Sequence, residues 1–247
     1  MTLISSGFGR PAELRANDSS WFTSEDHRPR RWLKRYLAPL AVATWACLAT
    51  NAQAHPHVWV TMNTDLLYAP DGSVTGLRQA WAFDDMFSAY STMGIPAKTK
   101  GQFTREELQP LAQVNVESLK DYAYFTYAWI DGKRQKEAFT DPIDYWLTYD
   151  DKADVLTLHF TLPFKEPVKA KVLKIEIYDP EFFIDFGFTE KNPVKLVGAP
   201  LQCALWTEKP PDVNFLSPQN LNRAFVPSEA NIGMGMDFAN KILVQCP

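Results

Sequence analysis

Short β-rich segments separated by turn residues are the strongest constraint on the fold of this chain. In VLTLHFTL, residues 155–162, every second residue from Leu156 to Leu162 is apolar, and His159 lies on the opposite face of the predicted strand. Residues 57–83 read as two strands around the turn APDGS, and an Asp-Gly turn divides a later β-rich run at 131–132. The pattern predicts a series of antiparallel hairpins.

One part of the chain departs from this pattern. Residues 104–122, TREELQPLAQVNVESLKDY, carry leucines near the helical period, and Thr104 with Glu107 forms a capping box. A helical turn is also expected in DDMFSAYSTMG, residues 84–94. We therefore predict a mainly β (α+β) fold, an antiparallel, sandwich-like domain with an inserted helical segment at about 84–121.

The first 54 residues have the features of a leader and signal peptide. RPRRWLKR is basic, the following YLAPLAVATWACLAT is apolar, and NAQA places small residues before a cleavage point after Ala54. The apolar run is shorter than the roughly 20 residues that a membrane-spanning helix needs. We expect residues 1–54 to be removed and residues 55–247 to form a single periplasmic β-rich domain without a transmembrane segment.

Two other readings of this leader stay open. Cys47 could be a lipoprotein cysteine, although Trp45 stands where such signals have a small residue. The apolar run could also remain uncleaved and act as an anchor.

The charge of the mature chain bears on its partners. Removing the leader takes away seven of the 25 basic and four of the 29 acidic residues, which leaves a net charge of −7. An acidic, exported protein is not expected to bind nucleic acid, and its surface suits a cation better than an anion.

Two cysteines remain after cleavage, Cys203 and Cys246. In an oxidising compartment they are expected to form a disulfide that closes a loop of about 40 residues and contributes roughly 3–4 kcal/mol. A metal site built from the two thiols is the alternative.

A histidine pair at the predicted new N-terminus is the main candidate site. His55 would carry a free α-amine with a pKa of about 7.7–8.0, and His57 faces the same way if this segment is a strand. Imidazole suits Zn, Cu and Ni. Pro56 lacks the backbone N–H that amino-terminal Cu/Ni motifs deprotonate, so a site of imidazoles and carboxylates is expected.

The candidates to complete such a site are a third histidine and four aspartates: His159, Asp84, Asp85, Asp179 and Asp185. Each type also has a structural interpretation. A strand histidine is often half-buried and hydrogen-bonded, paired aspartates before a helix cap it, and an aspartate before proline is a common turn residue.

Five blocks of the mature chain resemble the DUF1007 family: HPHVWV, WAFDDMFS, YAYFT, LTLHFTLP and YDPEFFIDF. The family consists of bacterial exported proteins described as periplasmic components of uncharacterised ABC-type transport systems. The resemblance implies an association with an inner-membrane metal transporter, because members are similar to neighbours or fusion partners of nickel/cobalt-type transporters.

The chain departs from the pattern of this family in one loop. Related chains tend to carry an EF-hand-like loop before the helix, and here Pro96, Lys98 and Lys100 occupy loop positions that need oxygen ligands. We expect no calcium site in this loop and a helix-capping turn in its place.

These observations predict a binding protein rather than an enzyme. The leading hypothesis is a periplasmic accessory of a transport system for Zn, Ni, Co or Cu, which ligates the metal through the N-terminal His-Pro-His. A metal-free interaction module of an ABC-type transporter is the alternative. A copper enzyme with an N-terminal histidine ligand is a third hypothesis.

Overall fold

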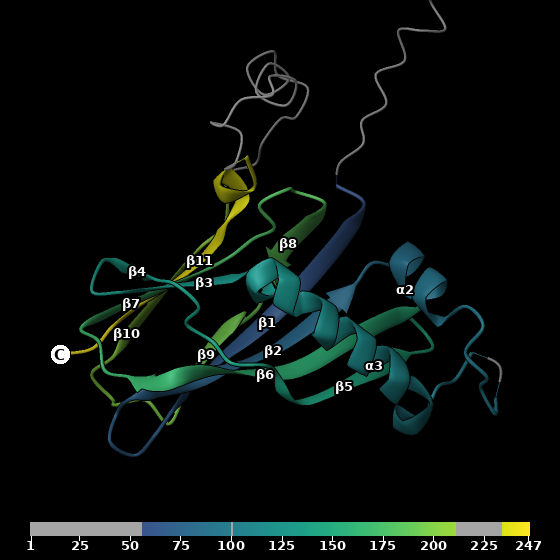
Figure 1. The fold of residues 1–247 in the computed structure, drawn as a ribbon, viewed down its shortest axis with the longest axis horizontal. Helices are drawn as coiled ribbons and strands as arrows, with labels where there is room; N and C mark the ends of the chain where they lie inside the picture. The colour runs from purple at the N-terminus through teal and green to yellow at the C-terminus, as the bar shows by residue number, and fades with distance from the viewer. Residues whose placement is uncertain (1–55, 100, 211–233) are drawn as a thin grey trace, which may run out of the picture. The chain divides into compact units, whose positions relative to one another are not determined.

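Two β-sheets form the framework of the protein (Figure 1). The structure, a computed structural model, describes residues 56–99, 101–210 and 234–247. The predicted leader, the cleavage point at Ala54 and the candidate ligand His55 lie outside the described residues.

The first sheet has the strand order β5-β6-β2-β1-β8, and β9 also pairs with β1. Its strands are β1 (Val58–Tyr68), β2 (Val74–Phe83), β5 (Ile143–Asp150), β6 (Val155–Val168), β8 (Ile184–Phe188) and β9 (Val194–Val197). The hairpins β1–β2 and β5–β6 are antiparallel, as predicted. β1 adds parallel pairs with β8 and β9, so this sheet is mixed rather than purely antiparallel.

The second sheet is antiparallel throughout and has the order β10-β11-β7-β3-β4. Its strands are β3 (Thr126–Ile130), β4 (Lys133–Gln135), β7 (Val172–Ile177), β10 (Ala204–Glu208) and β11 (Asn240–Gln245). The predicted turn at 131–132 joins β3 to β4, where Asp131 and Gly132 both have positive φ.

One hydrophobic core lies between the sheets because strands such as β1 and β6 bury alternate residues. On β6 the even-numbered residues predicted to face the core, from Leu156 to Leu162, are each at most 1% exposed. The rings of Trp81 on β2 and Phe160 on β6 meet edge to face with centroids 4.9 Å apart. The predicted mainly β fold with an inserted helical segment is confirmed.

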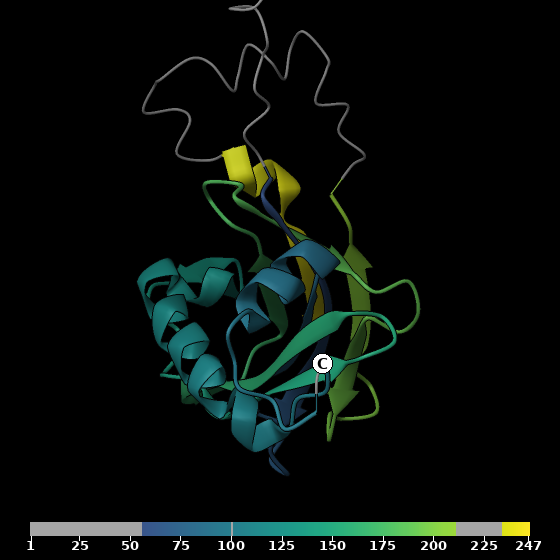
Figure 2. The same cartoon turned by 90° about the vertical axis from the view of Figure 1, so that its right-hand side faces the viewer.

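The helical segment consists of α2 (Asp85–Thr92), α3 (Arg105–Leu119) and the 3-10 element η1 (Lys120–Phe125). The Thr104 hydroxyl accepts a hydrogen bond from the Glu107 N–H, and the Glu107 carboxylate accepts one from the Thr104 N–H, which confirms the predicted capping box. α3 packs against β5 and turns the face with Leu108 and Ala112 to the core (Figures 1 and 2).

η1 contains an unusual backbone feature. Ala123, Tyr124 and Phe125 have consecutive φ values of 51°, 55° and 50°, in the left-handed region. This conformation costs roughly 1–2 kcal/mol for each residue with a side chain. The turn brings the rings of Tyr122 and Phe125 into a stack with centroids 5.2 Å apart.

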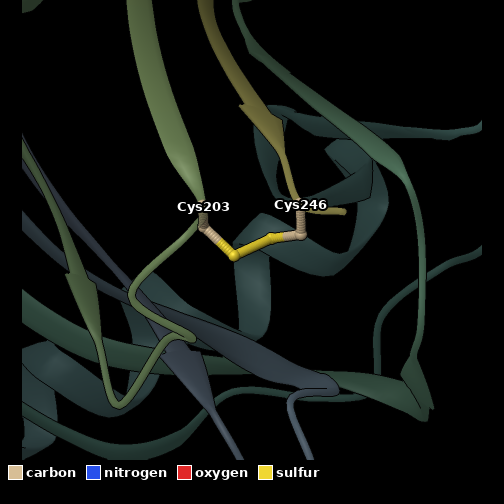
Figure 3. Close-up of a disulfide and its surroundings, with 2 residues drawn as sticks. All are labelled: Cys203 and Cys246. Atoms are coloured by element: carbon tan, nitrogen blue, oxygen red, sulfur yellow. A yellow bond between two sulfur atoms is a disulfide. The ribbon is translucent and has the colours of Figure 1, made fainter.

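Cys203 and Cys246 form the predicted disulfide, with an S–S distance of 2.03 Å (Figure 3). The bond lies at one end of the β10–β11 pair, where Ala204 is level with Gln245. A further 3-10 element, η3 (Met234–Phe238), precedes β11. Across the described ranges, no helix is both long and apolar enough to cross a membrane.

Candidate functional site

His57 lies immediately before β1, beside the segment that leads into β8. Its backbone N–H donates to the Phe183 carbonyl over 2.9 Å, and its ring centroid is 4.8 Å from that of Phe183. The histidine is therefore held next to a segment that follows it by more than a hundred residues.

Asp185 stands on β8, the strand that pairs with the residues directly after this histidine. It is level with Trp59 in the parallel pair β1–β8, and side chains at paired positions share a face. Strand spacing and rise place the Cα atoms of His57 and Asp185 roughly 8 Å apart. Asp185 is half-buried, and burial raises the pKa of its carboxyl. No hydrogen bond or ion pair from the described part of the chain reaches this carboxylate.

Asp84 has a structural role that the sequence also suggested. One carboxylate oxygen accepts from the Phe87 N–H over 2.8 Å and caps α2, and the other accepts from the Trp59 N–H over 2.9 Å. The side chain thereby ties α2 to the start of β1. Asp85 is exposed in the first turn of α2, where its carboxylate accepts from the Met86 N–H over 2.8 Å.

Asp179 is only 4% exposed and organises the loop that leads into β8. Its carboxylate accepts three backbone N–H groups, from Glu181, Phe183 and Ile184, at 2.9, 3.0 and 3.0 Å. Both oxygens are therefore engaged by the protein. Asp179 fixes the backbone on which Phe183 and Asp185 stand, which is the turn role considered from the sequence.

The structure does not bring His159 and His57 together. His159 is level with Ala80 on β2, which is level with Asn63 on β1, six residues beyond His57. At about 3.3 Å per residue this separation is roughly 20 Å along the strand.

His159 has partners of its own. Its Nε2 lies 3.0 Å from the Thr148 hydroxyl oxygen, and its ring stacks on Trp146 with centroids 4.8 Å apart. The Arg105 guanidinium covers the same indole at 4.6 Å. Burial, and secondarily the charge of Arg105, lower the pKa of His159. This is the environment of a half-buried, hydrogen-bonded strand histidine.

Of the candidate ligands within the described ranges, Asp84 and Asp185 lie level with Trp59, two residues after His57, and Asp185 is the one whose carboxylate accepts no hydrogen bond. No group of three or more His, Cys, Asp or Glu side chains among the residues described has the geometry of a metal site. A complete metal shell here needs donors from His55, which lies outside those residues, from water or from a partner.

An apolar cavity of about 320 Å³ opens on the core-facing side of β1, opposite the face that carries Trp59 and Asp185, and the sequence analysis missed it. Its floor is the core-facing side of β1 and β2, with Val58 and Phe83, and its walls include Phe87 of α2 and Leu119 of α3. Two of its sixteen lining residues are acidic, Asp179 and Glu181, and none is basic. The lining comes from segments far apart in the chain, so local sequence patterns carry no signal for it.

A second, larger cleft of about 770 Å³ lies between η1, the β3–β4 hairpin and the segment 136–141. Its charged groups are largely paired: Lys120 with Asp141, and Lys165 with Glu137, each at 2.9 Å. These pairs are exposed and stabilise the fold by at most about 1 kcal/mol each.

A comparison with known protein families shows to which family this chain belongs. The family described as "Protein of unknown function (DUF1007)" matches residues 40–246. The chain belongs to the DUF1007 family. No curated protein matches this DUF1007 member. The five sequence blocks that resemble the family each contribute residues to the lining of the apolar cavity, for example Val58, Phe87, Phe125, Leu158 and Phe183.

Proposed function

We propose that this DUF1007 protein is a periplasmic transition-metal-binding accessory of a metal transport system. His57 and Asp185 are the proposed ligands on the folded domain, and His55, with its ring and α-amine, is the proposed ligand from the new N-terminus. Zn, Ni, Co and Cu all accept imidazole together with carboxylate. An inner-membrane metal transporter is the proposed partner.

The observation that carries this proposal is the state of Asp185. Burial of an ionised carboxylate without a partner is unfavourable, and such groups in proteins are usually paired or coordinate a metal. Asp185 is half-buried and lacks a partner among the residues described, and it lies level with Trp59, two residues after His57. A divalent cation between the two side chains would offset the cost of its burial.

The other candidate residues take different places in this proposal. Asp179 acts as a positioning residue because its oxygens hold the backbone before β8. Asp84 and Asp85 add negative charge near the start of α2 without joining the ligand set. His159 is left outside the shell, since it lies roughly 20 Å from His57 along the sheet.

The alternative is a metal-free interaction module of an ABC-type transporter. The apolar cavity and the exposed apolar residues around it favour this function. The two hypotheses separate on one property, which is whether metal binding requires His57 and Asp185.

The test is a calorimetric titration of the exported, purified protein with Zn²⁺, Ni²⁺, Co²⁺ and Cu²⁺, preceded by an intact mass. A mass that begins at His55 and one-to-one binding are expected. His57→Ala and Asp185→Asn should each weaken binding at least tenfold. Asp85→Asn and His159→Gln are the matched controls and should bind as the wild type does.

Two results would contradict the proposal. One is binding no tighter than roughly 1 mM, or about 4.1 kcal/mol, for all four metals. The other is tight binding that Asp185→Asn and Asp85→Asn affect equally, because a diffuse acidic surface would explain that result.

A further inference from the structure

α2 shows an inverted amphipathic pattern. Its buried residues are polar, Ser88 and Thr92, whereas Met86 and Tyr90 are 68% and 75% exposed. Met93, directly after the helix, is also 75% exposed. Met86, Tyr90 and Met93 follow the spacing i, i+4, i+7 and therefore lie on one side of the helix. We call these three residues the α2 stripe.

Hydrogen bonds fix the helix in this orientation. The Ser88 hydroxyl donates to the Asp84 carbonyl over 2.6 Å and accepts from the Leu156 N–H of β6 over 3.0 Å. The Thr92 hydroxyl donates to the Ser88 carbonyl over 2.8 Å. The buried polar groups of α2 are thus satisfied, and the helix is held with its apolar side outward. Exposed apolar groups of this kind mark interaction surfaces.

α2 also contributes to the apolar cavity, because Phe87, the residue after Met86, forms part of the cavity wall. Two further aromatic residues line the cavity and remain exposed, Tyr122 at 51% and Phe183 at 44%. At about 320 Å³ the cavity is at the small end of the roughly 300–1,000 Å³ typical of ligand pockets. It has room for a large side chain rather than for an extended molecule.

The surroundings of the cavity are acidic. Glu181 in the lining is exposed, and no basic residue contributes to the lining. Asp121 and Glu117, each next in sequence to a lining residue, are exposed as well. Lys120 also follows a lining residue, but its ammonium group pairs with Asp141 at 2.9 Å. The sequence holds no basic residue between Arg78 and Lys98, the stretch that contains α2. A partner that covers this surface must bring positive charge next to apolar groups.

We propose that the cavity and the α2 stripe together form a docking surface for a short basic segment of a partner protein. A large apolar side chain of that segment enters the cavity, neighbouring apolar residues cover the α2 stripe, and Lys or Arg residues lie against Glu181 and the other carboxylates. This is the helix-in-groove or anchor mode of peptide recognition, in which charge complementarity adds specificity. The inference does not rest on the proposed metal site.

The same observations disfavour three other occupants. A second copy of this chain would bring a protein of net charge −4 with the same acidic surroundings against this surface. Anionic lipid headgroups would meet carboxylates rather than lysines. A small apolar molecule would fill the cavity but leave the α2 stripe uncovered.

The test selects binders for the exported wild-type protein from a phage-displayed library of random peptides in the presence of chelator. The enriched peptides are then synthesised, and their affinities are measured by fluorescence polarisation. We expect enriched sequences with an aromatic or leucine anchor next to Lys or Arg. Ser118→Trp, which fills the cavity from the exposed face of α3, and Glu181→Lys should each weaken binding at least tenfold.

Two control variants make the result specific. Glu166→Lys reverses an exposed charge on β6 outside the cavity lining, and Val114→Ser removes an exposed apolar group from α3. Both should bind the peptides as the wild type does, and the chelator keeps any metal out of the selection. Peptide binding can therefore be observed even if the protein binds no metal, and metal binding can be observed even if no peptide binds.

The inference is overturned if no peptide is enriched, if enriched peptides carry no net positive charge, or if Ser118→Trp and Glu181→Lys bind them as tightly as Glu166→Lys. Native mass spectrometry adds a further outcome. A small apolar molecule that copurifies with the wild type but not with Ser118→Trp would assign the cavity to that molecule instead of a peptide.

Discussion

Trp59 and Asp185 lie side by side across the parallel pair β1–β8, so that an indole 46% exposed to solvent borders a half-buried carboxylate. Burial raises the pKa of this carboxyl, which means that its ionised form is disfavoured at this position. Groups that cost stability in this way are frequent at functional sites.

Replacement of this carboxylate should stabilise the metal-free protein at neutral pH. Burial raises the pKa of the Asp185 carboxyl in the folded state above the usual 3.8. The protonated carboxyl therefore contributes fully to the stability of the fold below that pH, and this contribution is lost as the pH rises through the raised pKa. Asp185→Asn removes the charge and should unfold at a higher urea concentration than wild type at pH 7. The difference should disappear below pH 3.8. Equal midpoints at pH 7, with Asp85→Asn as control, would show that Asp185 costs the fold nothing.

His159 should make the stability of the protein fall on acidification. Burial lowers the pKa of His159 in the folded state, so the folded protein favours the neutral imidazole. The resulting contribution to the stability of the fold is present above pH 6.5 and is lost as the pH falls through the lowered pKa. Denaturation midpoints of wild type should therefore decrease more than those of His159→Gln between pH 7.5 and 5. At neutral pH the variant should lose roughly 0.5–1.5 kcal/mol with the Thr148 hydrogen bond. Parallel pH profiles for the two proteins would refute the titration argument.

The left-handed turn in η1 should be relieved by glycine. Ala123 has a φ of 51° and is exposed, so Ala123→Gly removes strain without leaving a cavity. We expect a gain of about 0.5–1 kcal/mol, because the penalty of the side chain exceeds the entropic cost of glycine. Ala123→Val should lose stability. The control is Ala153→Gly at an exposed turn position without positive φ, and a gain there of the same size would contradict the role of the turn.

The disulfide should be a major source of stability. It closes a loop with a sequence separation of 43 residues, for which the chain-entropy relation gives about 4 kcal/mol. The double variant Cys203→Ser, Cys246→Ser should lose about this amount in urea denaturation, and reductant should lower the stability of wild type to the same level. A wild-type protein indifferent to reductant would show that β10 and β11 stay paired without the bond.

The hairpins and the helix cap could be predicted because their signals are local. The alternation around Phe160 sets which side faces the core, and Thr104 with Glu107 marks the start of α3 within four residues. The structural interpretations of Asp84 and Asp179 were likewise available from their neighbours, a helix start and a following proline.

The remaining features depend on strand order or on contacts distant in sequence. The neighbourhood of His57 and Asp185 exists because β8 pairs in parallel with β1, and no local pattern specifies that pair. The separation of His159 from His57 follows from the position of β6 beyond β2. The left-handed turn at Ala123 carries no glycine, so its sequence gives no sign of positive φ.

The position of β1 also bears on how the chain reaches its native state. This strand, the first of the described domain, is bonded on one side to β2 and on the other to β8 and β9, whose residues come more than a hundred positions later. Its final neighbours are absent until most of the chain is available, and closing such long loops slows folding. The N-terminal strand should therefore acquire its full protection from hydrogen exchange late, with the arrival of β8 rather than with the closure of its own hairpin.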